Sequence, residues 1–425
     1  MYGGYDKQGA KVSCSTNYKK LMIKTVVLVD PRWQGHHLTY INLFTQILLQ
    51  QNYQVVILCP KPDEVYQLIQ KALPDKVSQL KVDLLKEAKI PPLKIVGMGA
   101  LYPTLSRWYL TAIAIDKVKK KFDLCPDLIF FSWLDGYLYL GNSAWLCLLI
   151  YKLVDLFFAY QWVGLLFHVR SETNHLNSSS NQSDPYKILR SPKCQAIAIL
   201  DELSTDRIEK LGKKVVIFPD IADDAPADST YSVVQKIREK ANGRQVIGLL
   251  GYLEKRKGVI SLIEIAKQST QKPWFFLFAG VLSKNTFSLT ESETIIKFAE
   301  SNPSNCFFWF ERIPQESQFN ALVKKCDVLY AVYEKFSSSS NILTKAALFE
   351  KLVLVSSGYC MESRIKEFNL GMSVDEDDLT NQINALEILL DKEEFYQKIG
   401  EPKFKEYREL HSINRLNKVF ANILK

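Results

Sequence analysis

The segment QVIGLLGYLEKRKGVISLIEIAKQ, residues 245–268, decides how this chain folds. It opens with a short apolar run, Gln245–Leu250, which predicts a buried strand. Gly251 and Gly258 flank the basic turn that follows, and apolar residues then recur at helical spacing, which predicts a helix over 258–268. Strand, turn and helix start aim backbone N–H groups and the positive end of a helix at one point. This arrangement suits a phosphate.

A second unit of the same kind follows. A strand over 327–333 leads into a serine-rich turn at 337–341, a helix over 341–350 and a strand over 352–356. The turn offers small residues and hydroxyl groups, and Asn341 is placed to cap the helix. Two such turns predict a nucleotide or diphosphate pocket that includes Ser338, Ser339, Ser340 and Asn341. A flexible serine loop before an ordinary helix explains the same composition equally well.

Strand and helix signals alternate along both halves of the chain. Such alternation predicts right-handed crossovers and parallel sheets, that is, an α/β protein of two Rossmann-like, doubly wound domains facing a central cleft. Ligands bind such sheets at the carboxyl ends of their strands. The remaining predicted strands are 24–29, 54–59, 128–132, 163–168, 196–200, 215–218, 274–279 and 306–310, and the remaining helices are 38–50, 143–158, 316–325 and 378–390.

The length of 425 residues favours two domains over one core. The acidic, proline-containing stretch 220–229 interrupts the alternation and marks a hinge. We expect a disordered extension at 1–21, an acceptor-side domain at 22–220, a linker at 221–244, a donor-binding domain at 245–400, and a C-terminal helix at 401–425 that packs back on the first domain.

The composition excludes some classes of protein. Net charge is +8, with 47% hydrophobic and 24% charged residues, and no basic region or zinc-finger spacing points to nucleic acid. The eight cysteines form no CxxC pair, which indicates buried, reduced thiols in a cytoplasmic protein. The polar N-terminus has no signal-peptide core.

The longest apolar stretch, 144–169, is interrupted by Lys152 and Asp155. Neither half reaches the roughly 20 residues that a membrane span needs. A buried helix followed by a buried strand explains the stretch. The alternative is a surface that touches lipid, peripheral at the inner face of the membrane, because aromatic residues such as Trp145 and Tyr151 suit that interface.

Individual residues suggest roles at the carboxyl edges of the sheets. Lys257 is the candidate phosphate clamp, although a solvated turn also tolerates its charge. Glu334, just past a buried strand, is placed to accept hydrogen bonds from sugar hydroxyls. Gly35 and His36 lie in the turn after the first strand, where glycine permits close approach to a ligand, and His168 ends a strand at the same edge.

Metal and common cofactors are not indicated. The adjacent His36 and His37 have no third ligand nearby in the sequence. The acidic run 375–378 precedes a helix, where N-capping is the simpler interpretation. There is no G-x-G-x-x-G and no G-x-x-x-x-G-K-[ST], which argues against NAD dehydrogenases and P-loop enzymes.

Taken in order, these motifs resemble those of GT-B glycosyltransferases, and are most similar to glycosyltransferase family 4. Gly251-x-Leu253-x-x-x-Lys257-Gly258 resembles the family's G-R-L-x-x-x-K-G, and residues 333–356 resemble its E-x7-E-A-x-A-x-G-x-P-V-V-A-S. Weaker matches lie at Gly35, His168, 202–204 and 218–223. Tyr252 replaces the family arginine, and Lys345 occupies the position of the second glutamate.

The resemblance implies transfer of a sugar from a nucleotide-activated donor to an unknown acceptor (glycan, lipid or small molecule), with retention of configuration and without metal or cofactor. Such reactions serve polysaccharide or glycolipid biosynthesis. It implies that Lys257 holds the diphosphate. Where the chain departs from the family motif, the serine turn and Lys345 offer a different way to build the rest of that anion site. Gly35 would approach the phosphates, and His168 would face the reacting sugar. The substitutions at 252 and 345 keep open an alternative, a catalytically inactive GT-B-like binding or assembly subunit.

Overall fold

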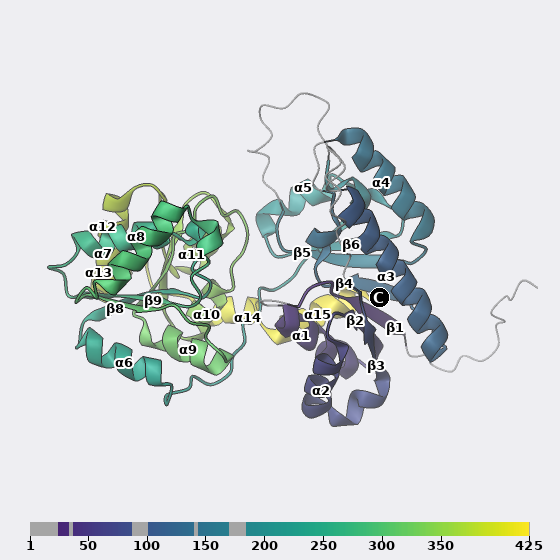
Figure 1. Ribbon diagram of the computed structural model, residues 1–425, viewed down its shortest axis with the longest axis horizontal. Coiled ribbons are helices and arrows are strands. Elements are labelled where there is room, and N and C mark those ends of the chain that lie inside the picture. Colours follow the sequence, from purple (N-terminus) through teal and green to yellow (C-terminus); the bar gives the residue numbers. More distant parts are fainter. Residues whose placement is uncertain (1–23, 34–36, 87–100, 140–142, 170–183, 425) are drawn as a thin grey trace, which may run out of the picture.

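Two parallel β-sheets organise the chain (Figure 1). The structure is a computed structural model that describes residues 24–33, 37–86, 101–139, 143–169 and 184–424. The first sheet has seven strands in the order β3-β2-β1-β4-β5-β6-β7, and the central pair aligns Val29 of β1 with Phe131 of β4. Its strands are β1 Thr25–Val29, β2 Gln54–Cys59, β3 Leu80–Leu84, β4 Leu128–Phe131, β5 Trp162–Leu166, β6 Cys194–Ile199 and β7 Lys214–Ile217.

The second sheet has six strands in the order β10-β9-β8-β11-β12-β13. Every strand pair in both sheets is parallel, which confirms the predicted fold class. Most strands are apolar along their whole length because helices cover both faces of a parallel sheet. The strands are β8 Gln245–Leu250, β9 Trp274–Ala279, β10 Cys306–Trp309, β11 Val328–Ala331, β12 Leu352–Ser356 and β13 Gly371–Val374.

Helices cover the first sheet on both faces. Apolar residues of α3 and α4 pack in one core, and those of α1, α2 and the C-terminal α15 pack in the other. Trp108 of α3 and Phe44 of α1 are fully buried centres of these two cores. The helices are α1 His37–Gln50, α2 Pro62–Ala72, α3 Leu101–Phe122, α4 Ala144–Phe157 and α5 Thr205–Glu209.

The second sheet is covered in the same way. One core includes residues of α6, α9, α10 and α11, and the other includes residues of α7, α8, α12 and α13. Residues 221–244 therefore contain a helix, α6, that packs in the second lobe. The helices are α6 Ser232–Ala241, α7 Val259–Gln268, α8 Leu289–Glu300, α9 Glu316–Lys325, α10 Ile342–Leu348, α11 Cys360–Phe368, α12 Leu379–Leu390 and α13 Lys392–Lys398.

The C-terminal segment crosses between the lobes (yellow in Figure 1). It forms two helices, α14 Phe404–Leu410 and α15 Ile413–Ile423, where the sequence predicted one helical run. Ser412 interrupts the run because its hydroxyl accepts a hydrogen bond from the Arg415 N–H and so starts a new helix. Tyr407 of α14 lies in a core of the second lobe, whereas Phe420 of α15 lies in a core of the first.

Two predicted helix caps had opposite outcomes. The Asp378 carboxylate accepts a hydrogen bond from the Asn381 N–H at the start of α12, so the capping interpretation of the acidic run is confirmed. Asn341 precedes α10 but makes no side-chain capping hydrogen bond, because its backbone is already helical and its side chain cannot reach the first-turn N–H groups.

Seven cysteines lie in the described residues, and all of them are free thiols. Six are buried, as predicted, and Cys125 is exposed. Burial raises the pKa of the thiols of Cys59, Cys194, Cys306 and Cys326 to about 12, so they pack as small apolar side chains. Among the described helices, none is long and apolar enough to cross a bilayer.

Candidate active site

A cavity of about 250 Å³ lies at the carboxyl edge of the second sheet. The segments that follow β8, β9, β10 and β11 build it, which is where a doubly wound sheet binds ligands. The lining residues are Leu250, Gly251, Tyr252, Lys257, Gly280, Val281, Arg312, Ile313, Glu316, Phe319, Tyr333, Ser340, Asn341, Ile342 and Lys345. Five of the predicted donor-binding residues therefore meet in one cavity: Gly251, Lys257, Ser340, Asn341 and Lys345.

Glycine is required where the turns of this edge approach one another. At Gly280 φ is +132°, and a Cβ atom would lie 1.8 Å from the Gly251 carbonyl oxygen. At Gly258 φ is +71°, and a Cβ atom would lie 2.5 Å from the Val332 carbonyl oxygen. Side chains at these positions would push the turns apart and open the floor of the cavity.

Lys257 carries the unpaired charge of the basic turn. The turn is a short 3-10 helix, Lys255–Lys257, in which Lys255 pairs with Glu291 at 2.6 Å and Arg256 pairs with Glu254 at 2.9 Å. In the described part of the chain, no carboxylate lies within ion-pair distance of Lys257 Nζ.

Lys257 Nζ faces the Tyr333 ring at 5.7 Å from its centroid. Burial lowers the pKa of Lys257 to about 8, and the neighbouring Arg256 guanidinium acts in the same direction. A desolvated ammonium without an anionic partner is a ready site for a ligand anion.

Lys345 lines the same cavity, but its donors are already engaged. Its ammonium donates to the Asp223 carbonyl oxygen at 2.6 Å, to Glu316 Oε2 at 3.0 Å and to Asn320 Oδ1 at 2.5 Å. An ammonium has three N–H groups, so none is left for a phosphate. Lys345 thus holds α10, α9 and the linker together and orients the Glu316 carboxylate.

The serine turn divides between two environments. Ser340 and Asn341 line the cavity. Ser338 and Ser339 are buried and bond elsewhere: Ser338 Oγ lies 2.9 Å from His168 Nδ1, and Ser339 Oγ donates to Asp220 and accepts from Arg364. Only the second half of the predicted turn is thus available at the cavity.

His168 stands where the two lobes meet. Asp135 positions it, because the Asp135 carboxylate accepts the backbone N–H groups of Phe167 and His168, both at 2.9 Å. The pKa of His168 lies below its usual range, mainly through loss of water contact; Asp135 acts in the opposite direction, and the Arg256 and Arg32 guanidiniums lower it further. The imidazole is therefore neutral near pH 7 and bonds across the interface to Ser338.

The structure describes only His37 of the Gly35-His36-His37 turn. Gly35 and His36 fall outside the described residues. His37 begins α1 as a buried residue, and its Nδ1 lies 2.8 Å from Asp30 Oδ1. Ser132 Oγ donates to the other oxygen of Asp30 at 2.8 Å. His37 thus fastens the turn after β1 from within.

Glu334 does not line the cavity. Its backbone N–H donates to the Arg256 carbonyl oxygen at 2.6 Å. Burial raises the pKa of its carboxyl group; Lys255 opposes this shift, and Glu376 and Asp377 add to it. Glu334 therefore belongs to a charged rim between the basic turn and the acidic turn before α12.

Arg364 of α11 is an interdomain residue that the sequence analysis missed. It is buried and donates to both carboxylate oxygens of Glu202, at 2.9 and 2.7 Å, and to the Leu200 carbonyl oxygen. Burial acts to raise the pKa of Glu202, but the bonds from Arg364 hold it below its usual range. An arginine on an amphipathic helix carries no sequence signal for this role.

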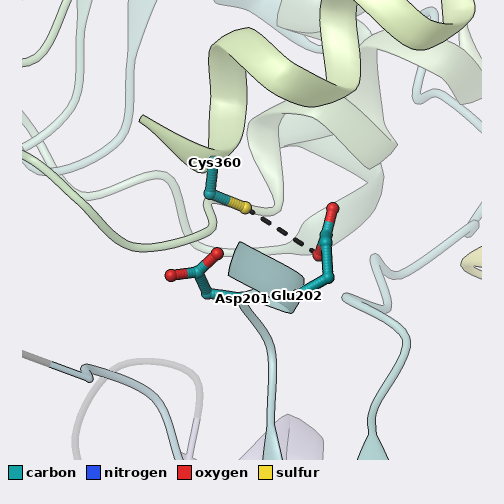
Figure 2. A group of neighbouring side chains, drawn as sticks. All are labelled: Asp201, Glu202 and Cys360. Atoms are coloured by element: carbon teal, nitrogen blue, oxygen red, sulfur yellow. Dashed lines mark hydrogen bonds between the residues drawn. The ribbon is translucent and has the colours of Figure 1, made fainter. Parts of the chain in front are cut away.

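The Arg364 contact also explains a nearby acidic cluster. Figure 2 shows the Cys360 thiol pointing at the Glu202 carboxylate, with Asp201 beside it. Glu202 is paired with Arg364, and Asp201 accepts hydrogen bonds from the Leu203 N–H and the Ser204 hydroxyl. These protein contacts engage the carboxylates of the group.

Arg312 and Glu316 are cavity residues that the sequence analysis also missed. Both come from the segment between β10 and α9, which has no motif spacing. The Arg312 side chain is exposed and makes no ion pair within the described residues, whereas the Glu316 side chain is 40% exposed and pairs with Lys345. A cation and a carboxylate thus reach the cavity from an element that the sequence marked only as a helix start.

Comparison with solved structures identifies the fold. The structure matches HepE of Anabaena in complex with UDP and glucose (TM-score 0.61, 14% identity, covering 94% of this chain and 99% of that one). It matches a sucrose-phosphate synthase of Thermosynechococcus elongatus (TM-score 0.65, 12% identity, 94% and 98%). It also matches a UDP-forming α,α-trehalose-phosphate synthase of Burkholderia xenovorans (TM-score 0.62, 12% identity, 95% and 99%).

The chain has the GT-B fold. These matches extend over nearly the full length of each partner, so both lobes and their connection are shared. No family model and no curated protein sequence matches the chain. The similarity at these identities is one of fold, and the assignment to family 4 stays a resemblance of motifs.

Proposed function

We propose that the protein is a hexosyltransferase-type glycosyltransferase that moves a sugar from a nucleotide-activated donor to an acceptor, with retention of configuration and without a metal ion. The observation that carries this proposal is the desolvated, unpaired ammonium of Lys257 in a cavity at the carboxyl edge of the second sheet. HepE has been solved with UDP and with UDP-glucose, and the trehalose-phosphate synthase is UDP-forming, which makes uridine nucleotides the first ligands to test.

In this proposal the second lobe stabilises the leaving group. Negative charge builds on the nucleoside diphosphate as the bond to the sugar breaks, and fixed cations and hydrogen-bond donors offset it. Lys257 is the central cation. Arg312 supplies the second positive charge, because the family arginine is replaced by Tyr252 in this chain. The Ser340 hydroxyl and the Asn341 amide are the neighbouring polar donors.

Glu316 is the residue that we assign to the hydroxyl groups of the donor. Its carboxylate lines the cavity and is fixed by Lys345 at 3.0 Å, which leaves oxygen lone pairs free to accept. The family motif has a glutamate where this chain has Lys345. In this chain, Glu316 of α9 would supply that carboxylate. Glu334, on the charged rim, remains our prediction for contact with the sugar.

The first lobe faces the reacting sugar through His168. Asp135 fixes the backbone of His168, and Ser338 bonds its neutral imidazole, so the ring is oriented to hydrogen-bond a sugar hydroxyl without adding charge. Gly35 and His36 remain predicted contacts to the phosphates in this proposal.

Binding and turnover test the proposal directly. We expect titration calorimetry with uridine, guanosine and adenosine diphosphates to find micromolar binding of one of them. We expect slow hydrolysis of the matching nucleotide sugar, undiminished by EDTA. Loss of hydrolysis in EDTA with recovery in Mn²⁺ would contradict the metal-free mechanism.

A non-catalytic binding or assembly subunit is the competing function. Two specific observations favour it. All three N–H donors of Lys345 bond to protein atoms, and the position of the family arginine is occupied by Tyr252, which is 48% exposed. Absence of binding to every nucleotide and nucleotide sugar in the panel would support it.

We also propose that α4 makes a peripheral membrane contact. Trp145 is 65% exposed and Leu156 is 81% exposed, and Leu148, Leu149 and Leu153 share the same face. Lys152 lies among them and is also exposed. An apolar helix face with an interfacial tryptophan and a central lysine suits the boundary of an anionic lipid layer.

A further inference from the structure

A second cavity, of about 190 Å³, lies at the carboxyl edge of the first sheet. Its polar lining is Arg32 from the turn after β1, Lys86 from the segment after β3, Arg107 and Thr111 from α3, and Tyr137. Pockets for drug-sized ligands measure roughly 300–1,000 Å³, so this smaller cavity fits one end of a ligand. None of the roles assigned above uses it.

The charges of this cavity are unbalanced. Three cationic side chains line it and no carboxylate does. Across the described ranges, no carboxylate lies within ion-pair distance of Arg32, Lys86 or Arg107. Arg107 donates to the Gly136 carbonyl oxygen at 2.5 Å, which fixes the guanidinium in the wall but leaves its charge uncompensated.

Asp30, which lies beside this cavity, is already engaged. The Asp30 carboxylate accepts from His37, from the Ser132 hydroxyl and, at 2.9 Å, from the backbone N–H of Arg32. Tyr137 stays neutral, because burial raises the pKa of its hydroxyl group, which lies 2.8 Å from Thr111 Oγ1. The pKa of Arg107 is lowered, first by burial and then by the Arg32 guanidinium, so the two cations feel one another. Like charges held together in this way favour an anion between them.

The cavity lies next to the interdomain edge. The Arg32 guanidinium lies 5.7 Å from the centre of the Trp133 ring. Trp133 stacks on Phe167 with ring centres 4.1 Å apart and lies 6.1 Å from the His168 ring. His168 in turn bonds to Ser338 of the second lobe. A ligand anchored by Arg32 and Arg107 therefore has its other end beside His168.

We propose that this cavity binds a phosphate group carried by the acceptor. A phosphomonoester carries about −1.5 to −2 charges near neutral pH and matches the three cations better than a single carboxylate does. Guanidinium groups bind phosphate oxygens in pairs, and the Thr111 and Tyr137 hydroxyls add donors. Phosphate binding by the cavity does not depend on the proposed glycosyl transfer. The identification of the phosphate-bearing molecule as the acceptor rests on that proposed function.

Calorimetry on the full chain tests the site with defined probes: glucose 6-phosphate, glucose, inorganic phosphate and UDP. We expect glucose 6-phosphate to bind and glucose not to bind. Arg32→Gln and Arg107→Gln should each weaken the phosphate ester at least about tenfold, the effect of losing a charged hydrogen bond. UDP affinity should not change in these variants, which also shows that they fold. Arg238→Gln, an exposed arginine on α6, is the matched control and should bind like the wild type.

The source of the phosphate is distinguished by a second arm. If only a lipid-borne phosphate binds, vesicles containing phosphatidic acid will capture more of the wild type than of Arg32→Gln or Arg107→Gln, and glucose 6-phosphate will give no heat. Both outcomes support the phosphate site.

The proposal is overturned if neither glucose 6-phosphate nor the phosphatidic acid vesicles bind the protein. It is also overturned if this binding is equal in Arg107→Gln and Arg238→Gln. Arginine-dependent phosphate binding without any nucleotide binding would keep the phosphate site and reject the donor function. Nucleotide binding without arginine-dependent phosphate binding would keep the donor function and reject the phosphate site.

Discussion

Lys257 and Lys345 show how far single residues can be read from the sequence. The spacing of Gly251, Lys257 and Gly258 predicted a cation at a phosphate turn. The structure places Lys257 at the cavity, and no carboxylate of the described residues lies within ion-pair distance of it. Lys345 occupies an equally suggestive motif position, yet its three donors are engaged by neighbours on other elements. A motif gives the position of a charge, whereas the partners that neutralise it come from distant segments.

Replacing Lys257 tests the phosphate clamp. We expect Lys257→Ala to weaken nucleoside diphosphate binding by about 1.5–3 kcal/mol, because a charged hydrogen bond to a desolvated group is lost. Lys257→Arg keeps the charge and should retain more of the affinity. Calorimetry measures both, and equal affinity of wild type and Lys257→Ala would remove Lys257 from the site.

The same lysine should make binding depend on pH. With the pKa of Lys257 near 8, the ammonium is charged below that pH and is lost above it. Diphosphate affinity should therefore hold between pH 6.5 and 7.5 and fall by up to about tenfold per pH unit above pH 8. Arginine stays charged in this range, so Lys257→Arg should show a flat profile. An alkaline decline that persists in Lys257→Arg would assign the dependence to another group.

His411 gives a stability prediction of the opposite kind. It is buried enough that its pKa falls to about 3, and its Nδ1 accepts the Asp220 N–H at 2.9 Å. Unfolded histidine titrates near 6.5, so its contribution is complete above that pH and is lost as pH falls from 6.5 towards 3. Urea unfolding at pH 7.5 and 5.5 should show a loss of about 1.4 kcal/mol from this group.

His411→Gln provides the control, because its amide oxygen can accept the same N–H without titrating. The difference in stability between wild type and His411→Gln should shift by that amount between the two pH values. A constant difference would show that the group titrates alike in both states.

At the scale of elements, apolar strands were predictable and two edge strands were not. Runs such as Thr25–Val29 and Gln245–Leu250 are buried on both faces and stand out in the sequence. β3 alternates with half-buried Lys81 and Asp83, and β13 has only four residues and begins with glycine. Both lie at sheet edges, where a strand pairs with only one neighbour. Such a strand is less buried, so its sequence shows a weaker apolar pattern.

The cavities depend on the segments between elements, which explains why their residues were partly missed. Arg312, Glu316, Arg32 and Lys86 all lie in or next to connections whose sequences carry no periodicity. The order of the strands brings these connections together, and periodicity within one segment does not reveal that order.

The exposed face of α4 makes a testable element. We expect Trp145→Gln combined with Leu156→Gln to reduce sedimentation with anionic vesicles, because the two most exposed apolar side chains of the face are removed. Leu289→Gln is the matched control, since Leu289 is 85% exposed on α8 of the other lobe. If the double variant and the control sediment with vesicles like the wild type, α4 is not the contact.

For the whole molecule, the interface between the lobes sets how they can move. Arg364 joins Glu202 and Leu200 of the first lobe to Ser339 of the second, and α15 packs the end of the chain on the first sheet. The connecting segment is fixed at Asp220, whose carbonyl oxygen accepts from Thr344 at 2.6 Å. Beyond it, Asp224, Pro226 and Ser229 are exposed. The stretch 224–230 is therefore the exposed part of the connection between the lobes.

Limited proteolysis tests this exposed connection and the proposed function together. A protease that cuts before aspartate should cleave at Asp224 or Asp228 more readily than within either sheet, since exposed backbone outside regular structure is cut first. The fragments should stay associated through α15, so they are mapped by mass spectrometry after denaturation. A bound nucleoside diphosphate should slow the cut, because a ligand held between Lys257 and the first lobe favours closure. The same nucleotide should not protect Lys257→Ala. First cuts inside Gln245–Leu250 or Val328–Ala331 would contradict the accessibility expected of 224–230, and cutting at 224–230 that no nucleotide slows would favour the non-catalytic function.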